Sequence, residues 1–394
     1  MENNYQKFKA FAENGSKALE LMRSKAFNPS EIKQLRTWTL TEMCALINKS
    51  AQVIRENEKK GKLKPPKVNK KNKRCYSLED INEIRNYFKI RPSKGKKAVP
   101  AIIAFTNFKG GVAKTTSAIH SAQYFAKAGY KVLLIDCDSQ ASATSCFGYA
   151  PDEHIAKEET LVPFFLGEIK SLRTIIKKTY WDGLDLIPAN LTLYSVELEL
   201  PVVYNDSMLA GNHVQLHRIL SDGIQSIQND YDIIVIDCPP AMSILNTNAL
   251  YAANGLVVPV PPELPDIASM IQFFGMIEGT LEKFPSKKYD FLRILITKHD
   301  GSATNNAISE ALRHLYGMHV MRSELAITQV IKKARTEMCS IYELQTYKGS
   351  KQTLDRAIQI VDNVNKELEL LIKSIWTKNE TTNSANIEKL IEVT

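Results

Sequence analysis

The chain has 394 residues, 44% of them apolar and 24% charged, which is typical of a folded globular protein and excludes an intrinsically disordered one. No apolar run is long enough to span a bilayer and the amino terminus has no apolar signal core, so we expect a cytoplasmic protein. The net charge of +8 favours a polyanionic partner, and the six scattered cysteines argue against a zinc ribbon or an iron–sulfur cluster.

Residues 1–36 are predicted to form a helical arm. Apolar residues recur at helical spacing from Tyr5 to about Arg23, and no neighbouring segment obviously covers the resulting apolar face. The arm therefore either pairs with its copy in a second subunit or packs on a neighbouring domain of the same chain. The sequence leaves both arrangements open.

Residues 37–90 have the pattern of a winged helix-turn-helix domain that binds DNA. Two capped helices are expected over residues 39–47 and 51–60, followed by a lysine-rich segment without acidic residues. The second helix would enter the major groove, with Gln52 and Arg55 as candidate base contacts, while the lysines would bind phosphates. The alternative is a solvated basic loop on a dimerisation domain. The candidate DNA-binding residues here are Ser50, Gln52, Arg55, Lys59, Lys67, Lys70, Lys71, Lys73 and Arg74.

Residues 91–100 are basic and contain proline and glycine, which predicts a linker. From residue 101 onward, apolar strands alternate with helices up to about residue 377. This alternation predicts an α/β fold with a mostly parallel sheet and helices on both faces. The polar segment 378–394 is expected to be a disordered tail. The expected strands cover residues 101–106, 131–136, 184–188, 231–237, 255–259 and 291–297.

The segment from Phe108 to Thr116 joins an apolar strand to a helix and has the lysine–threonine pair of a P-loop. Small residues let consecutive backbone N–H groups bind phosphate oxygens at the positive end of the helix. Lys114 would neutralise the β- and γ-phosphates of ATP, and the Thr115 hydroxyl would bind Mg²⁺. The expected ATP-binding residues are Lys109, Gly110, Gly111, Val112, Ala113, Lys114, Thr115 and Thr116.

Two further apolar strands end in aspartates. Asp136 and Asp138 follow the first, and Asp237 follows the second. The carboxyl ends of parallel strands form the ligand crevice of an open α/β sheet, so these side chains should lie beside the P-loop. Asp138 could position the attacking water, and Asp237 would reach Mg²⁺ directly or through water. Asp136 would hold the loop geometry or the water shell of Mg²⁺.

Together these segments resemble the ParA/MinD superfamily, and specifically the long-form ParA partition ATPases. The P-loop with its additional lysine, Lys109, resembles the deviant Walker A motif of that family. Residues 136–140 resemble its D-x-D-P-Q switch, and residues 231–240 its Walker B motif and second switch. The chain departs from the family at Ala113, where glycine is usual, and at Ser139, where proline is usual.

The resemblance also implies roles for particular residues. Lys109 would reach the nucleotide bound by the partner subunit, so that catalysis depends on Lys109, Lys114 and Asp138. Pro261, which follows a later strand, resembles the adenine-side loop. The family binds chromosomal DNA without sequence preference through basic residues of its carboxyl-terminal helices, although ordinary surface charge is an equal alternative for each one. The matching residues are Lys332, Lys333, Arg335, Lys351 and Arg356.

The function that the resemblance implies is DNA partition driven by slow ATP hydrolysis. The ATP form would be a homodimer that coats nucleoid DNA, and a centromere-bound ParB-type protein would stimulate hydrolysis. The ADP or nucleotide-free form would repress its own operon through residues 37–90.

Three other functions are less consistent with the residues. A MinD-like ATPase that cycles on membranes needs a basic amphipathic carboxyl-terminal helix, and residues 384–394 carry two glutamates and one lysine. A metabolic relative would have a cysteine pair and no use for a basic winged domain. A repressor with a vestigial nucleotide site is opposed by the intact Lys114, Thr115, Asp138 and Asp237.

Overall fold

The computed structural model describes residues 4–26, 33–68, 72–95, 98–209, 215–344 and 349–391. The chain divides into two units, residues 1–34 and 35–394, which are described separately. The described part of the first unit is helix α1 (Asn4–Ala26), in agreement with the apolar spacing of the arm. On this helix the rings of Phe8 and Phe11 pack edge to face with centroids 6.4 Å apart.

The second unit begins with a small three-stranded antiparallel sheet and three helices. Thr39 forms the predicted capping box with Glu42, and Ser50 accepts a hydrogen bond from the Val53 N–H, so both helix starts follow from local sequence. The strands have the order β1-β3-β2, with β2 and β3 as the two strands of the basic hairpin. The elements are β1 (Trp38–Thr39), α2 (Leu40–Ile47), α3 (Ala51–Lys59), β2 (Lys67–Val68), β3 (Arg74–Tyr76) and α4 (Leu78–Tyr87).

The larger sheet confirms the predicted α/β fold. Within the described ranges it has eight strands in the order β11-β10-β9-β4-β8-β5-β7-β6, all paired in parallel except β6 with β7. The six predicted strands are all present within two residues of their expected ends, and β6 and β11 are edge strands that were not predicted. The strands are β4 (Ala101–Phe105), β5 (Val132–Asp136), β6 (Lys177–Lys178), β7 (Leu184–Ile187), β8 (Ile233–Asp237), β9 (Gly255–Val260), β10 (Phe291–His299) and β11 (Leu325–Ala326).

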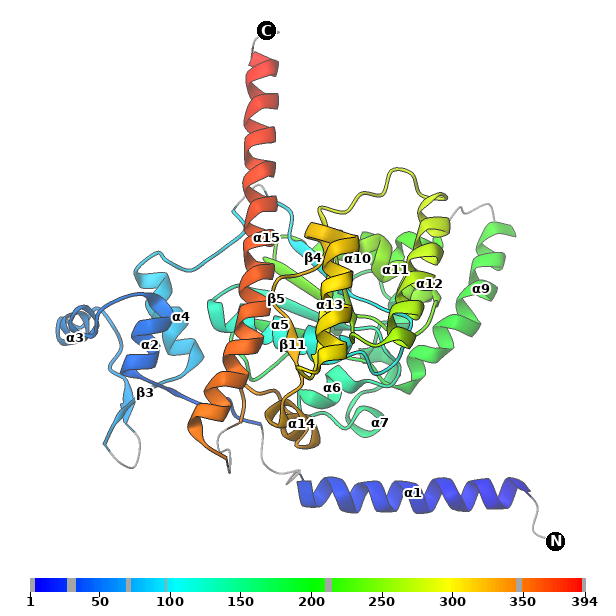
Figure 1. The fold of residues 1–394 in the computed structure, drawn as a ribbon, viewed down its shortest axis with the longest axis horizontal. Coiled ribbons are helices and arrows are strands. Elements are labelled where there is room, and N and C mark those ends of the chain that lie inside the picture. The colour runs from blue at the N-terminus through cyan, green and yellow to red at the C-terminus, as the bar shows by residue number, and fades with distance from the viewer. Residues whose placement is uncertain are drawn as a thin grey trace. The chain divides into compact units, whose positions relative to one another are not determined.

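Helices cover both faces of this sheet (Figure 1). One face packs against α5 (Lys114–Ala128), α6 (Ser142–Cys146), α14 (Gln329–Thr336) and α15 (Lys351–Ile391). The other face packs against α8 (Val162–Phe165), α9 (Tyr194–Leu209), α10 (Ile219–Ile227), α11 (Ile244–Ala252), α12 (Leu264–Leu281) and α13 (Ala303–Tyr316). The remaining short helices are α7 (Pro151–His154) and 3-10 turns at Lys157–Glu159, Leu172–Ile175, Leu191–Leu193, Leu216–Arg218 and Gly317–His319.

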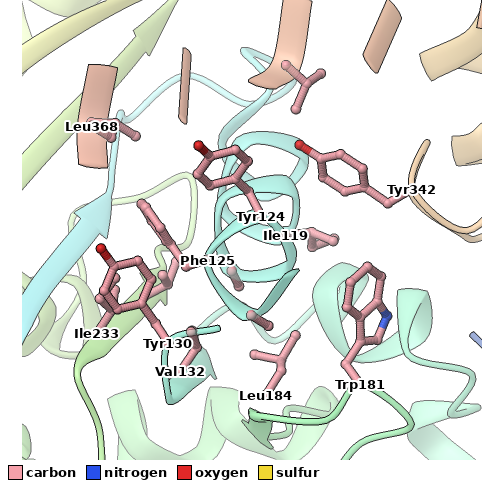
Figure 2. Packing of buried hydrophobic residues seen from close by; sticks show 14 of the residues in the cluster. Ile119, Tyr124, Phe125, Tyr130, Val132, Trp181, Leu184, Ile233, Tyr342 and Leu368 are labelled. Atoms are coloured by element: carbon pink, nitrogen blue, oxygen red, sulfur yellow. The ribbon is translucent and has the colours of Figure 1, made fainter. Parts of the chain in front are cut away.

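Strands β5, β8 and β9 are almost wholly apolar because both of their faces are buried, whereas the edge strand β6 consists of two lysines. On the α5 side, Phe125 packs among Tyr130, Val132 and Ile233 (Figure 2). This apolar cluster also includes buried residues of α2, α3 and α4, so residues 37–88 share a core with the large sheet.

The predicted linker is bound to the large sheet domain rather than loose. The Arg91 Nε donates to the carbonyl oxygen of Gly129 at 2.7 Å, and the Lys94 N–H donates to Asp232 Oδ1 at 3.0 Å. On α4, the Arg85 guanidinium donates to the Lys127 carbonyl oxygen at 2.8 Å. Burial lowers the pKa of Arg85 to about 10. These contacts place α4 against the carboxyl-terminal end of α5.

The carboxyl-terminal region differs from its prediction. Helix α15 extends to Ile391, so the expectation of a disordered tail is wrong for residues 378–391. The reason is that the sequence from Lys351 to Ile391 contains neither glycine nor proline, and the polar residues there are compatible with helix. Within the described ranges, no helix combines the length and the apolar character that a membrane span requires.

Candidate functional site

The P-loop lies between β4 and α5, as predicted. Gly111 and Ala113 both have positive φ angles, of 76° and 74°, which turn the backbone around the start of α5. Ala113 is the first residue outside the helix, and its side chain has no polar atom with which to cap the first N–H groups of α5. The loop is anchored from β10, where the Thr297 hydroxyl donates to the Val112 carbonyl oxygen at 3.0 Å. The free helix N–H groups are therefore available to an anion.

Ala113 is an alanine in a conformation that favours glycine. The left-handed conformation costs a residue with a Cβ about 1–2 kcal/mol, which explains why glycine suits this position. At Gly111, a Cβ would meet no described atom within 4 Å, so the space beside this residue is open. The loop has the shape of a phosphate cradle.

Lys114 is the first residue of α5 and its side chain is turned into the loop. Its Nζ donates to the Lys109 carbonyl oxygen at 2.9 Å, and only 6% of the residue is exposed. Burial lowers the pKa of Lys114, and the nearby charges of Asp237 and Asp138 act in the opposite direction. The cation lies next to the carboxylates that the sequence placed at the neighbouring strand ends.

Asp136 and Asp237 are neighbours across the pair β5–β8, where they are register partners, and both are fully buried. The N–H and hydroxyl of Thr144 donate to Asp136 Oδ2 at 2.9 and 2.7 Å, and the Asp138 N–H donates to Oδ1 at 3.1 Å. Asp136 therefore binds both the loop after β5 and α6.

Neither carboxylate oxygen of Asp237 accepts a hydrogen bond from the residues that the structure describes, although the nearby Thr115 hydroxyl lowers its pKa. Burial, followed by the charge of Asp136, raises that pKa well above the ordinary value. An unpartnered buried carboxylate beside a threonine hydroxyl and a phosphate cradle is a suitable ligand for Mg²⁺.

The pair should make Mg²⁺ binding pH-dependent. Burial raises the pKa of Asp136 to about 7 and that of Asp237 well above its ordinary value, so the pair holds a proton near neutral pH that Mg²⁺ must displace. One displaced proton predicts that Mg²⁺ affinity at saturating ATP is about tenfold higher at pH 8 than at pH 6. Isothermal titration at both pH values measures this difference. Asp237→Asn should bind Mg²⁺ more weakly and retain only the pH dependence of the nucleotide, whereas equal affinities in the unmodified protein would contradict a shared proton.

Asp138 lies on the loop after β5 and is almost buried. One of its carboxylate oxygens, Oδ1, accepts the Gln140 N–H at 3.0 Å. Burial raises its pKa, whereas that hydrogen bond and the charge of Lys114 lower it. Asp138 is thus held near Lys114, as predicted.

Lys109 is held within its own subunit. Its Nζ lies 2.9 Å from Oδ2 of Asp266, which belongs to the first turn of α12. Asp266 was not predicted, because no local pattern links it to a loop 157 residues earlier.

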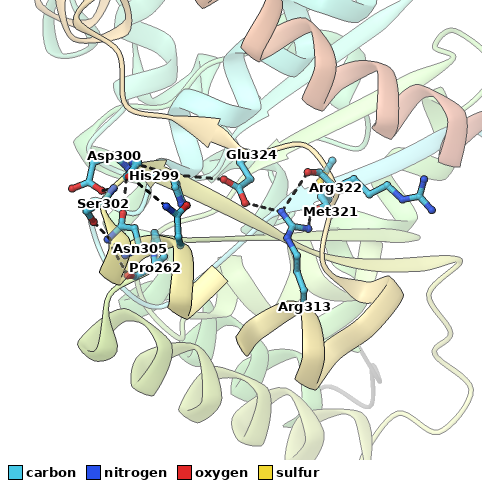
Figure 3. A network of polar contacts seen from close by, with 11 residues as sticks. Pro262, His299, Asp300, Ser302, Asn305, Arg313, Met321, Arg322 and Glu324 are labelled. Carbon is cyan, nitrogen blue, oxygen red and sulfur yellow. Dashed lines mark hydrogen bonds and ion pairs between the residues drawn. The ribbon is translucent and has the colours of Figure 1, made fainter. Parts of the chain in front are cut away.

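Pro261 follows β9, the strand next to β4 in the sheet. The loop after β9 is bound to α13, because the side-chain amide of Asn305 donates to the Pro262 carbonyl oxygen at 3.3 Å (Figure 3). The Oδ1 of Asn305 also accepts a hydrogen bond from the Asp300 N–H. Figure 3 also shows Arg313 binding Glu324, which fixes the segment after α13. Pro261 therefore lies just after the carboxyl end of β9, in a loop that is bound to α13.

The amino-terminal DNA-binding candidates fall into three groups. Gln52, Arg55, Lys59, Lys67 and Lys73 are exposed. Ser50 caps α3, and Arg74 forms an ion pair with Glu58, so both have structural tasks. Lys70 and Lys71 lie outside the described residues.

In the carboxyl-terminal region, Lys332 and Arg335 are exposed on α14, whereas Lys333 lies 3.5 Å from Glu337 on the same helix. Lys351 and Arg356 are exposed in the first two turns of α15. Helices α14 and α15 contact each other.

The matches to known proteins are consistent with one another. Residues 100–288 match a family model described as an AAA domain. The chain is similar to protein SopA of Escherichia coli K12, with 33% identity over 371 residues that cover 92% of this chain and 95% of that protein. It is also similar to the chromosome partitioning protein ParA of Caulobacter vibrioides, with 30% identity over 211 residues, covering 53% of this chain and 72% of that protein.

The fold is shared with a solved structure described as a partition protein. The two have a TM-score of 0.67 and 21% identity, over 94% of this chain and 99% of that one. With the P-loop, the strand-end aspartates and the similarity to SopA over nearly its whole length, the chain belongs to the ParA/MinD family of P-loop partition ATPases.

Proposed function

We propose that the protein is a DNA-partition ATPase that dimerises on ATP and binds DNA in two nucleotide-dependent modes. The main support for ATPase activity is that three features lie together. They are the open phosphate cradle, the buried Lys114 and the carboxylate of Asp237, which has no hydrogen-bond partner among the described residues. Family membership supports the link to DNA segregation.

The cradle fits ATP with Mg²⁺. The N–H groups of residues 110–116 would bind the phosphates, with Lys114 released from the Lys109 carbonyl to neutralise them. The Thr115 hydroxyl and Asp237 would hold Mg²⁺, with Asp136 behind them through water. Bound Mg²⁺ would neutralise phosphate charge, and Pro261 would line the adenine side.

Asp138 is proposed to position the attacking water. Removing its carboxylate in Asp138→Ala should lower kcat by about 100-fold, within the usual range for a positioned general base, and change ATP affinity less than about threefold. Single-turnover hydrolysis beside fluorescent-nucleotide binding separates the two effects. Asp152→Ala, an exposed aspartate on α7, is the matched control. Unchanged turnover in the Asp138 variant would transfer the water-positioning role to another residue.

Lys109 is proposed to complete the nucleotide site of the partner subunit in an ATP-dependent homodimer. Loose phosphoryl-transfer transition states respond strongly to positive charge supplied from a second molecule, and without it hydrolysis is slow. A ParB-type protein bound at a centromere site would stimulate the assembled dimer. The arm, residues 1–36, would contribute to dimerisation.

Two DNA-binding surfaces are proposed. Residues 37–90, as a winged helix-turn-helix domain attached through residues 91–100 to the ATPase domain 101–377, would bind the operator of its own operon. The docking of α4 on the end of α5 supports communication with the P-loop at the other end of that helix. The basic residues of α14 and α15 would bind nucleoid DNA without sequence preference in the ATP state.

The lysines of the basic hairpin formed by β2 and β3 provide a separate test of operator binding. Neutralising Lys67, Lys70, Lys71 and Lys73 to glutamine should weaken operator binding and reduce the salt slope by about one for each lost phosphate contact, with ATPase activity unchanged. Replacing Lys332 and Arg335 with glutamine is the matched comparison and should weaken only ATP-dependent binding to random DNA. Fluorescence anisotropy at several salt concentrations measures both. An unchanged operator affinity in the first variant would show that residues 37–90 do not bind the operator through this hairpin.

A further inference from the structure

Two consecutive residues of the P-loop are bound to α12. The Lys109 Nζ forms an ion pair with Asp266 at 2.9 Å, and the Phe108 ring packs edge to face on Phe273 with centroids 4.7 Å apart. Asp266 and Phe273 are seven residues apart and so lie on the same side of α12. This helix therefore holds the loop by one ionic and one aromatic contact.

The two side chains of the ion pair differ in their exposure to solvent. The Asp266 side chain is 6% exposed, whereas the Lys109 side chain is 37% exposed. Asp266 is the third residue of α12, where the positive end of the helix stabilises a carboxylate. The carboxylate can thus remain in place if Lys109 leaves, and Lys109 is the mobile partner.

The backbone of Lys109 is also engaged. Its carbonyl oxygen accepts the hydrogen bond from Lys114 Nζ at 2.9 Å, while its side chain is bound to Asp266. In this arrangement Lys114 is bound within the P-loop and Lys109 is bound to α12 of the same subunit. Phosphates that attract Lys114 would remove one of the contacts that hold Lys109 in place, leaving the hydrogen bond from its N–H to Asn107 and the ion pair with Asp266.

We propose that Asp266 is a positioning residue that retains Lys109 in its own subunit until a nucleotide and a second subunit together draw it away. This inference rests on the proposed function, because it assumes that Lys109 acts in the ATP dimer. Asp266 thereby sets the threshold for dimerisation: it opposes assembly of the nucleotide-free protein and makes the dimer depend on ATP.

The size of the effect follows from the symmetry of the dimer. A partly exposed ion pair contributes about a fivefold factor to an equilibrium. Two such pairs open when one dimer forms, so the factors multiply to about 25-fold. Asp266→Asn keeps the shape of the side chain and removes its charge, so the dissociation constant of the ATP dimer should fall by about this factor.

Sedimentation equilibrium of the full-length protein with the non-hydrolysable analogue AMP-PNP, and without nucleotide, measures this change. Glu278→Gln removes the same charge from an exposed position on α12 and should leave dimerisation unchanged. Asp266→Glu should recover much of the wild-type behaviour. Monomer affinity for a fluorescent ADP analogue should stay within about twofold, because a structural defect in α12 would change that affinity and a lost ion pair would not.

The outcomes separate this inference from the function on which it rests. Loss of the dimer in Lys109→Ala together with unchanged dimerisation in Asp266→Asn overturns the role of Asp266 and leaves the proposed function standing. A normal ATP dimer in Lys109→Ala overturns the proposed function itself. A tighter dimer in Asp266→Asn that disappears when Lys109→Ala is added supports both.

Discussion

Replacing Lys114 with methionine is expected to lower ATP affinity by at least 100-fold. Lys114 is the one cation that the structure places inside the described part of the cradle, close enough to lower the pKa of both Asp138 and Asp237. Without it, the β- and γ-phosphates would face the strand-end carboxylates uncompensated. A charge-assisted contact of this kind contributes about 3 kcal/mol, which corresponds to this loss of affinity.

Methionine retains the length and volume of the side chain, so the loop should remain folded. Fluorescent-nucleotide titration measures the affinity, and urea unfolding without nucleotide checks the fold. Lys131→Met, an exposed lysine after α5, controls for the change in net charge. Binding of ATP to the Lys114 variant with the affinity of the unmodified protein would contradict the assignment of the P-loop.

Replacing Lys109 with alanine is expected to separate binding from turnover. ATP affinity should change less than about fivefold, because Lys109 faces Asp266 on α12 and not the interior of the cradle. The ATP dimer should be lost, and kcat should fall by at least 100-fold, since charge supplied from a second subunit accounts for large factors in phosphoryl transfer.

Analytical ultracentrifugation and steady-state hydrolysis at saturating ATP test this separation. Removing Lys109 also leaves Asp266 without its ionic partner, so that the helix N-terminus alone stabilises the carboxylate. The double variant Lys109→Ala with Asp266→Asn removes that complication. Full turnover in the double variant would show that Lys109 has no catalytic role.

The parts of the site that depend on local sequence could be predicted. The strand–loop–helix order around Lys114 defines the cradle, and the apolar strands that end at Asp136 and Asp237 place both carboxylates at one sheet edge. The caps at Thr39 and Ser50 also follow from residues three positions apart. Each of these features is determined by neighbours along the chain.

The parts that depend on tertiary contacts could not be predicted. The pairing of Lys109 with Asp266 and the bond from Thr297 to Val112 arise from the strand order, which places β9 and β10 on the same side of β4. Arg85 is a charged residue of the kind expected on the exposed side of a helix, but it is buried against the end of α5. The edge strands β6 and β11 are only two residues long, too short for an alternating pattern to be detected.

The proposed function requires one protein to bind DNA in two modes that the nucleotide selects. The most direct test is DNA binding by the full-length protein without nucleotide and with ADP, ATP or a non-hydrolysable analogue. A labelled random duplex is compared with the duplex from just upstream of the protein's own gene. We expect ATP-dependent binding to the random duplex and stronger binding to the upstream duplex with ADP. Failure to bind either duplex in every nucleotide state would contradict the proposed function.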